Sequence, residues 1–225
     1  MPLLKWLNAW TTPPFEELTN ARLHDLMHAT VERLLPEGFE AAGELKWVRD
    51  TYAPVRHVFG FTKYKGGILR PYWGLSLDFV PHVSGKQIRW HRSNATARPD
   101  LHVPPRDPAL SLPYIHGERP VRRGHPTVVT TAITRAEPFW SNATTIESLP
   151  QAIAGLRAYL HGADLGFYNY TQHALTAAFV HAQNGNLPEA LSELAHHSVL
   201  WDSRVYQDLQ KRLEDAFVRR SNQML

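Results

Sequence analysis

The chain has 225 residues, of which 43% are hydrophobic and 11% aromatic, so it is long enough to bury one sizeable core. It contains no cysteine, which excludes disulfides, thiol nucleophiles and cysteine-based zinc sites. No apolar run approaches the roughly 18 residues of a membrane-spanning helix, and the first residues lack a secretory leader pattern, so we expect a cytoplasmic protein without membrane contact.

The formal net charge is only +3, but the charge is spread unevenly along the chain. Residues 46–135 hold 15 Lys and Arg against 5 Asp and Glu, whereas the two flanks together hold 9 basic and 16 acidic residues. This asymmetry predicts either an anionic partner or a basic surface that the acidic flanks neutralise within the molecule.

The first predicted element is a helix over residues 13–35. Thr12 can cap it, and Pro13 with Pro14 suits its first turn. Apolar residues recur at helical spacing and predict one buried stripe, formed by Leu23, Leu26, Met27, Thr30, Val31 and Leu34.

After Leu45 the apolar residues alternate, which predicts strands at Trp47–Val48, 55–64, 68–83 and 87–92. Their short glycine-containing connections predict an antiparallel meander. The β-branched run over 127–135 predicts a fifth strand. The sheet region therefore spans 45–135 and includes a proline-rich segment, 93–125, which we expect to be a long loop that contacts a partner.

The region over 148–220 is predicted to be helical. Ser148 and Gln151 form a capping-box pair before a helix that reaches Leu160. Further helices are predicted over 168–183, from a cap at Asn186 to about His197, and after a cap at Asp202. The predicted fold is a single α+β domain over 1–225: an N-terminal helix, an antiparallel meander of about four to five strands, and a C-terminal helical segment packed on the sheet.

No motif for covalent catalysis or phosphate binding is present: Gly-x-Ser-x-Gly and Gly-x-x-x-x-Gly-Lys are both absent. We therefore predict a protein that is not an enzyme and needs no cofactor. His24 and His28 have the spacing of two zinc ligands on a helix, but the metalloprotease motif has Glu where Asp25 stands. We favour two histidines at the edge of an amphipathic helix, with no metal; a hydrolase using both and a third ligand is the alternative.

The strongest signal is the mixture of cations and aromatic rings in the basic half. Cations can meet an acidic surface, and rings can anchor a partner or stack on bases. The competing interpretation is that the rings lie in the core and the cations are solvated or paired with acidic helices. The candidate partner-binding residues are Lys63, Lys65, Arg70, Tyr72, Arg89, Trp90, Arg92, Arg119, Arg122 and Arg123.

The predicted elements follow a recognisable order along the chain. This order is the N-terminal helix, the Leu35-Pro36-Glu37-Gly38-Phe39 turn, the Trp47-Val48-Arg49 strand, the meander and the helical end. This layout resembles a bacterial domain-of-unknown-function family associated with immunity proteins of polymorphic toxin systems. The resemblance implies a small cytoplasmic protein that binds and occludes a cognate toxin. A nucleic-acid-binding accessory protein that uses the same basic surface is the alternative.

Overall fold

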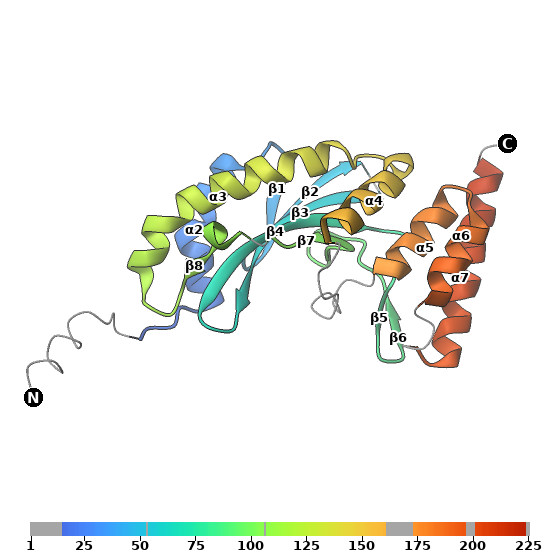
Figure 1. The fold of residues 1–225 in the computed structure, drawn as a ribbon, viewed down its shortest axis with the longest axis horizontal. Helices are drawn as coiled ribbons and strands as arrows, with labels where there is room; N and C mark the ends of the chain where they lie inside the picture. The colour runs from blue at the N-terminus through green and yellow to red at the C-terminus, as the bar shows by residue number, and fades with distance from the viewer. Residues whose placement is uncertain (1–14, 53, 106, 161–172, 197–200, 224–225) are drawn as a thin grey trace, which may run out of the picture.

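The computed structural model of the protein describes residues 15–52, 54–105, 107–160, 173–196 and 201–223. It confirms the α+β class: a helix near the N-terminus, a curled antiparallel sheet and several helices after it (Figure 1). The helices are α2 (Asn20–Leu34), α3 (Glu118–Ser141), α4 (Leu149–Leu160), α5 (His173–Gln183), α6 (Leu187–His196) and α7 (Ser203–Gln223), with short 3₁₀ turns η1 (Pro108–Leu110) and η2 (Ile146–Ser148). The strands are β1 (Phe39–Gly43), β2 (Lys46–Tyr52), β3 (Val55–Tyr64), β4 (Ile68–Leu77), β5 (His82–Ser84), β6 (Gln87–Arg89), β7 (Leu101–Val103) and β8 (Leu112–Pro113).

The main sheet is a meander in which β1, β2, β3, β4 and β7 are neighbours and all antiparallel, while β8 pairs with the start of β4. The predicted strand over 55–64 is confirmed, because β3 has these bounds. On one face, Trp47 stacks on a histidine of α2, and Phe59 packs against Trp140 of α3. Val58 points to the other side of the pleat, so the sheet has a helix-covered face and an opposite face.

Helices α2 and α3 lie side by side over the helix-covered face (Figure 1). The predicted stripe of α2 is confirmed, with its most buried members being Leu23, Met27 and Val31. The predicted start is wrong for residues 15–19, which are extended and pair with the segment just before α3. Thr19 caps α2 by accepting the Arg22 N–H at 3.2 Å; the predicted cap and first turn at 12–14 lie outside the described residues.

The predicted strands 68–83 and 87–92 extend too far. β4 ends at Leu77, whose carbonyl accepts the Val80 N–H at 3.0 Å in a turn. Pro81 follows, and it has no N–H with which to continue a ladder. β5 and β6 instead form a separate two-stranded hairpin, so Arg89 of β6 lies outside the main sheet.

The predicted strand over 127–135 is wrong, because these residues form the middle of α3. The hydroxyls of Thr130 and Thr134 donate to carbonyls four residues earlier, at 2.9 and 3.0 Å. Burial against the sheet thus outweighs the β-propensity of the Val and Thr run. The buried side chains recur at helical spacing: Val121, His125, Val128, Val129, Ala132, Ile133, Ala136 and Trp140.

The segment 93–125 is not one structureless loop, since it contains β7, η1, β8 and the start of α3. Its first part covers the opposite face of the sheet, where Lys46 Nζ donates to the carbonyls of Ala95 and Ala97 at 2.9 and 3.2 Å. The backbone of β7 lies close to Gly74 of β4, because a Cβ added at Gly74 would be 2.2 Å from the carbonyl oxygen of Leu101.

Helices α5, α6 and α7 pack on one another at the end of the long axis away from α2 (Figure 1). α4 contacts β7, and the Thr176 hydroxyl of α5 donates to the Asp100 carbonyl beside β7 at 3.2 Å. Residues 168–172 of the predicted third helical segment, and His197, lie outside the described residues. No helix in the described ranges is long and apolar enough to span a membrane.

Two of the predicted helix caps are confirmed. The Asn186 side chain accepts the N–H three residues later at 3.3 Å, and the Asp202 carboxylate accepts the N–H two residues later at 3.0 Å. The predicted pairing of Ser148 with Gln151 is wrong, because the Ser148 hydroxyl bonds back to the backbone of Thr145 at the start of η2. A short 3₁₀ turn therefore leads into α4.

Candidate partner-binding surface

The structure divides the predicted surface between two ends of the molecule (Figure 1). We call Lys65, Arg119, Arg122 and Arg123 the α3 basic end; they lie at the β3–β4 turn and in the first turns of α3. A backbone hydrogen bond of 3.0 Å between Tyr114 N–H and Gly67 carbonyl joins that turn to the segment before α3. The other group follows the β5–β6 hairpin beside α7 and comprises Arg89, Trp90 and Arg92.

The start of α3 carries no N-cap side chain, and the carboxylate of Glu16 lies beside it. Its N-cap residue is Gly117, with φ 72°, and among the described residues no side-chain hydrogen bond caps the helix. Glu118 accepts hydrogen bonds from Arg122 at 3.0 and 2.8 Å and also pairs with Arg22 of α2. These hydrogen bonds, from Arg122 first and then Arg22, hold the pKa of Glu118 below its ordinary value.

Among the described residues, Arg119 and Arg123 are two free cations of this end, and Lys65 is a third. Both arginines are exposed, and neither has an ion pair or side-chain hydrogen bond with another residue that the structure describes. With Glu118 and Arg122 they line a shallow surface hollow. The hollow therefore offers two guanidinium groups that the described residues leave unpaired beside a helix start.

The acidic flanks touch the basic stretch at few points. Within the described ranges, two ion pairs join a cation of 46–135 to a flanking carboxylate: Lys63 with Glu17 at 3.7 Å and Lys86 with Asp202 at 3.5 Å. The other described ion pairs of the stretch use its own carboxylates. Direct contacts therefore leave most of the positive surplus at the surface.

Lys63 and Arg70 do not share one basic sheet face. Lys63, on the helix-covered face, donates from Nζ to the Leu18 carbonyl at 2.5 Å and lies 4.5 Å from the ring centre of Tyr114. Arg70 points to the opposite face, where its Nε donates to Ser111 Oγ at 3.0 Å. Both side chains are used in internal contacts.

Tyr72 packs on the opposite face of the sheet. Its ring lies over Gly60, where an added Cβ would be 2.6 Å from the Tyr72 hydroxyl oxygen, and it meets the His102 ring edge-on at 5.1 Å. Burial raises the pKa of Tyr72 to about 12 and lowers that of His102 to about 4. Tyr72 belongs to the small apolar cluster around Val48 and Val58, so packing accounts for its position.

Trp90 joins the β5–β6 hairpin to α7. Its ring centre lies 4.4 Å from the guanidinium carbon of Arg92 and 5.7 Å from that of Arg212. Arg212 is held in turn by Asp208 at 3.0 Å. Arg89 is exposed and donates to Gln87 at 3.2 and 2.5 Å. The aromatic anchor predicted for a partner is thus engaged within the molecule.

His24 and His28 lie on the edge of α2, with ring centres 4.8 Å apart, and both stack on Trp47. His24 Nδ1 accepts the Leu45 N–H at 3.3 Å, and His28 Nε2 lies 3.2 Å from a Glu32 carboxylate oxygen. Burial, and then the neighbouring His28, lowers the pKa of His24. Ring packing and local pairing account for their positions.

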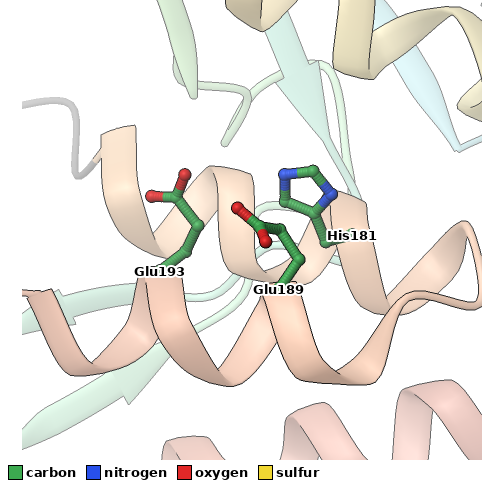
Figure 2. Close-up of side chains that lie close together, drawn as sticks. All are labelled: His181, Glu189 and Glu193. Carbon is green, nitrogen blue, oxygen red and sulfur yellow. The ribbon is translucent and has the colours of Figure 1, made fainter.

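A group of metal-ligand type that the sequence analysis missed lies between α5 and α6 (Figure 2). His181, Glu189 and Glu193 bring ligand atoms within 4.8 Å of one another. The available signal was the four-residue spacing of the two glutamates, directly after a predicted turn between helices.

Comparisons with family models, with curated proteins and with solved structures give no match. The resemblance to the immunity-protein family therefore stays a prediction. The fold and its surface define an α+β protein in which the described residues leave two arginines unpaired at the start of one long helix.

Proposed function

We propose that this is a non-enzymatic, cytoplasmic binding protein that recognises an acidic protein partner through the α3 basic end. The observation that carries the proposal is the exposure of Arg119 and Arg123, which the described residues leave unpaired beside a helix start without a side-chain cap. The helix macrodipole adds partial positive charge at that point. In this proposal the chain acts as one domain, with the C-terminal helical segment packed against the sheet.

The local charge balance supports an acidic partner. The carboxylates at this end are Glu16, Glu17 and Glu118, and the cations outnumber them. Glu16 lies against Gly117, so it offsets part of the charge at the helix start but leaves the outer arginines unpaired. The cations are Arg22, Lys63, Lys65, Arg119, Arg122 and Arg123.

The mechanism would be electrostatic steering followed by steric occlusion. Arginine forks can bind carboxylates with two hydrogen bonds, which gives geometric specificity as well as attraction. Exposed charges chiefly raise the association rate, and added salt weakens their effect. The resemblance seen in the sequence makes the active site of a cognate toxin the expected target.

The engaged aromatic rings favour a protein over single-stranded nucleic acid. Base stacking requires free rings, whereas Trp90 contacts Arg92 and Arg212, and Tyr72 lies over Gly60. Nucleic-acid binding is accordingly an outcome of the test rather than a second proposal.

The test begins with a tagged pull-down, with and without nuclease, followed by mass spectrometry and calorimetry on the identified complex. We expect the pull-down to capture an acidic protein whether or not nuclease is added. The double variant R119E/R123E should bind this protein at least about tenfold more weakly, and its affinity should depend less on salt concentration. Arg89→Glu, at the other end of the molecule, is the matched control and should keep wild-type affinity. Nuclease-sensitive material, or unchanged affinity and salt dependence in R119E/R123E, would overturn the proposal.

A further inference from the structure

We propose that His181, Glu189 and Glu193 form a binding site for a divalent transition-metal ion between α5 and α6. In Figure 2 the imidazole of His181 and the carboxylate of Glu189 point toward one another from the two helices, with Glu193 one turn further along α6. This site lies away from the α3 basic end and does not depend on the function proposed for it.

Local structure explains why these side chains converge. His181 lies in the last turn of α5, and its carbonyl accepts the Asn186 N–H at 2.9 Å, which fixes the reversal into α6. Glu189 and Glu193 are four residues apart on α6, so they lie on one face of that helix. The tight turn and the helical repeat thus place an imidazole opposite two carboxylates.

The distances between the three ligand atoms would suit a metal ion after a small movement of the side chains toward one another. The three ligand atoms lie within 4.8 Å of one another, whereas ligands at bond lengths of about 2.1 Å in a tetrahedron are about 3.4 Å apart. Glu189 is exposed and free to change rotamer, so side-chain motion can supply the difference of up to about 1.4 Å.

The donor chemistry selects the class of ion. One imidazole nitrogen and two carboxylates form a nitrogen–oxygen set without thiolate, which suits Zn²⁺ and other first-row divalent ions. Three protein ligands leave coordination positions for water or for a further ligand. His196 stands three residues after Glu193 on α6, the spacing at which helices present a glutamate and a histidine to one ion.

Arg157 of α4 positions the buried carboxylate. Glu193 is 7% exposed, and the guanidinium of Arg157 donates one hydrogen bond to each of its oxygens, at 2.7 and 2.8 Å. A carboxylate has about four lone-pair positions, so two stay available to an ion while the arginine fixes the group. Although burial opposes ionisation, Arg157 and then His181 and His196 hold the pKa of Glu193 below its ordinary value.

The test uses the full chain, freed of metal with a chelator and titrated with ZnCl₂ in a calorimeter and by thermal unfolding. We expect one ion per chain and a rise in Tm of about 5 °C at saturating zinc. The variants Glu189→Gln and His181→Gln should each lose both effects. Neither side chain is buried, so both variants should fold as the wild type does without zinc.

Glu32→Gln is the matched control, because it removes a helical carboxylate beside His28 and should leave zinc binding intact. Three outcomes would overturn the proposal: no zinc binding to the wild type at micromolar concentrations, unchanged binding in Glu189→Gln, or loss of binding in Glu32→Gln. The last of these would place the ion at His24 and His28 instead.

Discussion

Arg157 and Glu193, which are 36 positions apart in the sequence, form a two-pronged ion pair with Nη1–Oε1 and Nη2–Oε2 distances of 2.7 and 2.8 Å. The pair ties α4 to α6. The arginine side chain is half exposed, whereas the glutamate is buried. Removing the arginine would therefore leave a buried carboxylate without its counterion, which costs more than the loss of a surface ion pair.

We predict that Arg157→Ala lowers the free energy of unfolding by roughly 1–3 kcal/mol, less than for a fully buried pair because water reaches the arginine. Arg157→Lys should lie between the wild type and the alanine variant, because it keeps the charge and loses the fork. Urea unfolding at neutral pH measures both. Equal stability of all three proteins would show that the contact does not hold α4 to α6.

Acid should destabilise the fold through His57. This ring is buried, its Nδ1 lies 2.8 Å from Arg49 Nη2, and it stacks on Trp140 with ring centres 5.9 Å apart. Burial, and then Arg49, lowers its pKa from 6.5 to about 4. The folded state thus favours the neutral ring, so its contribution is complete above about pH 6.5 and is lost as the pH falls toward about 4.

The full shift corresponds to up to roughly 3 kcal/mol. Urea unfolding between pH 4 and 7 should show a steep loss of stability in the wild type and a shallower one in His57→Gln, which has no titrating ring. A parallel loss in the two proteins would mean that His57 does not carry this dependence.

The contribution of Asp100 to stability should depend on pH in the opposite direction to that of His57. Burial raises the pKa of this carboxyl well above 3.8, although Oδ2 accepts the Leu77 N–H at 2.7 Å. Because the folded state binds its proton more tightly, its contribution is complete below the unfolded pKa and is lost as the pH rises through the folded pKa. Asp100→Asn should therefore gain stability relative to the wild type as the pH rises from acid to neutral. A constant difference across that range would refute a buried neutral carboxyl.

Trp90→Ala should loosen the hairpin without affecting partner binding. It removes two cation–π contacts worth together about 1–2 kcal/mol, so amide exchange should speed up in β5, in β6 and in the first turns of α7. Arg89→Ala is the control, since Arg89 bonds only to Gln87 among the described side chains. A large loss of partner affinity in Trp90→Ala would instead restore this ring as a binding anchor.

The sequence predicted the elements whose signals are local. β3 has the expected bounds, and the caps at Asn186 and Asp202 form as the turn chemistry requires. The prediction over 127–135 is wrong because the β-branched residues there favour a strand by propensity, although Val128, Val129, Ala132 and their neighbours also follow a helical repeat. In this stretch packing against β4 decides the conformation.

The candidate surface was harder to predict, because it depends on which sheet each strand joins and on which face of the sheet each side chain lies. The hairpin of β5 and β6 leaves the main sheet after Pro81, which carries Arg89 and Trp90 to the far end of the molecule. The pleat of the sheet places Lys63 and Arg70 on opposite faces, and Arg212 of α7 contacts the ring of Trp90. These relationships are long-range, so no spacing along the chain encodes them.

The most direct test of partner binding at the α3 basic end is a hydrogen-exchange footprint of the protein with its purified partner. We predict that the amides of residues 63–67 and 116–124, around the α3 basic end, become protected in the complex, while those of the β5–β6 hairpin do not. Protection confined to the hairpin, or to α5–α7, would contradict it.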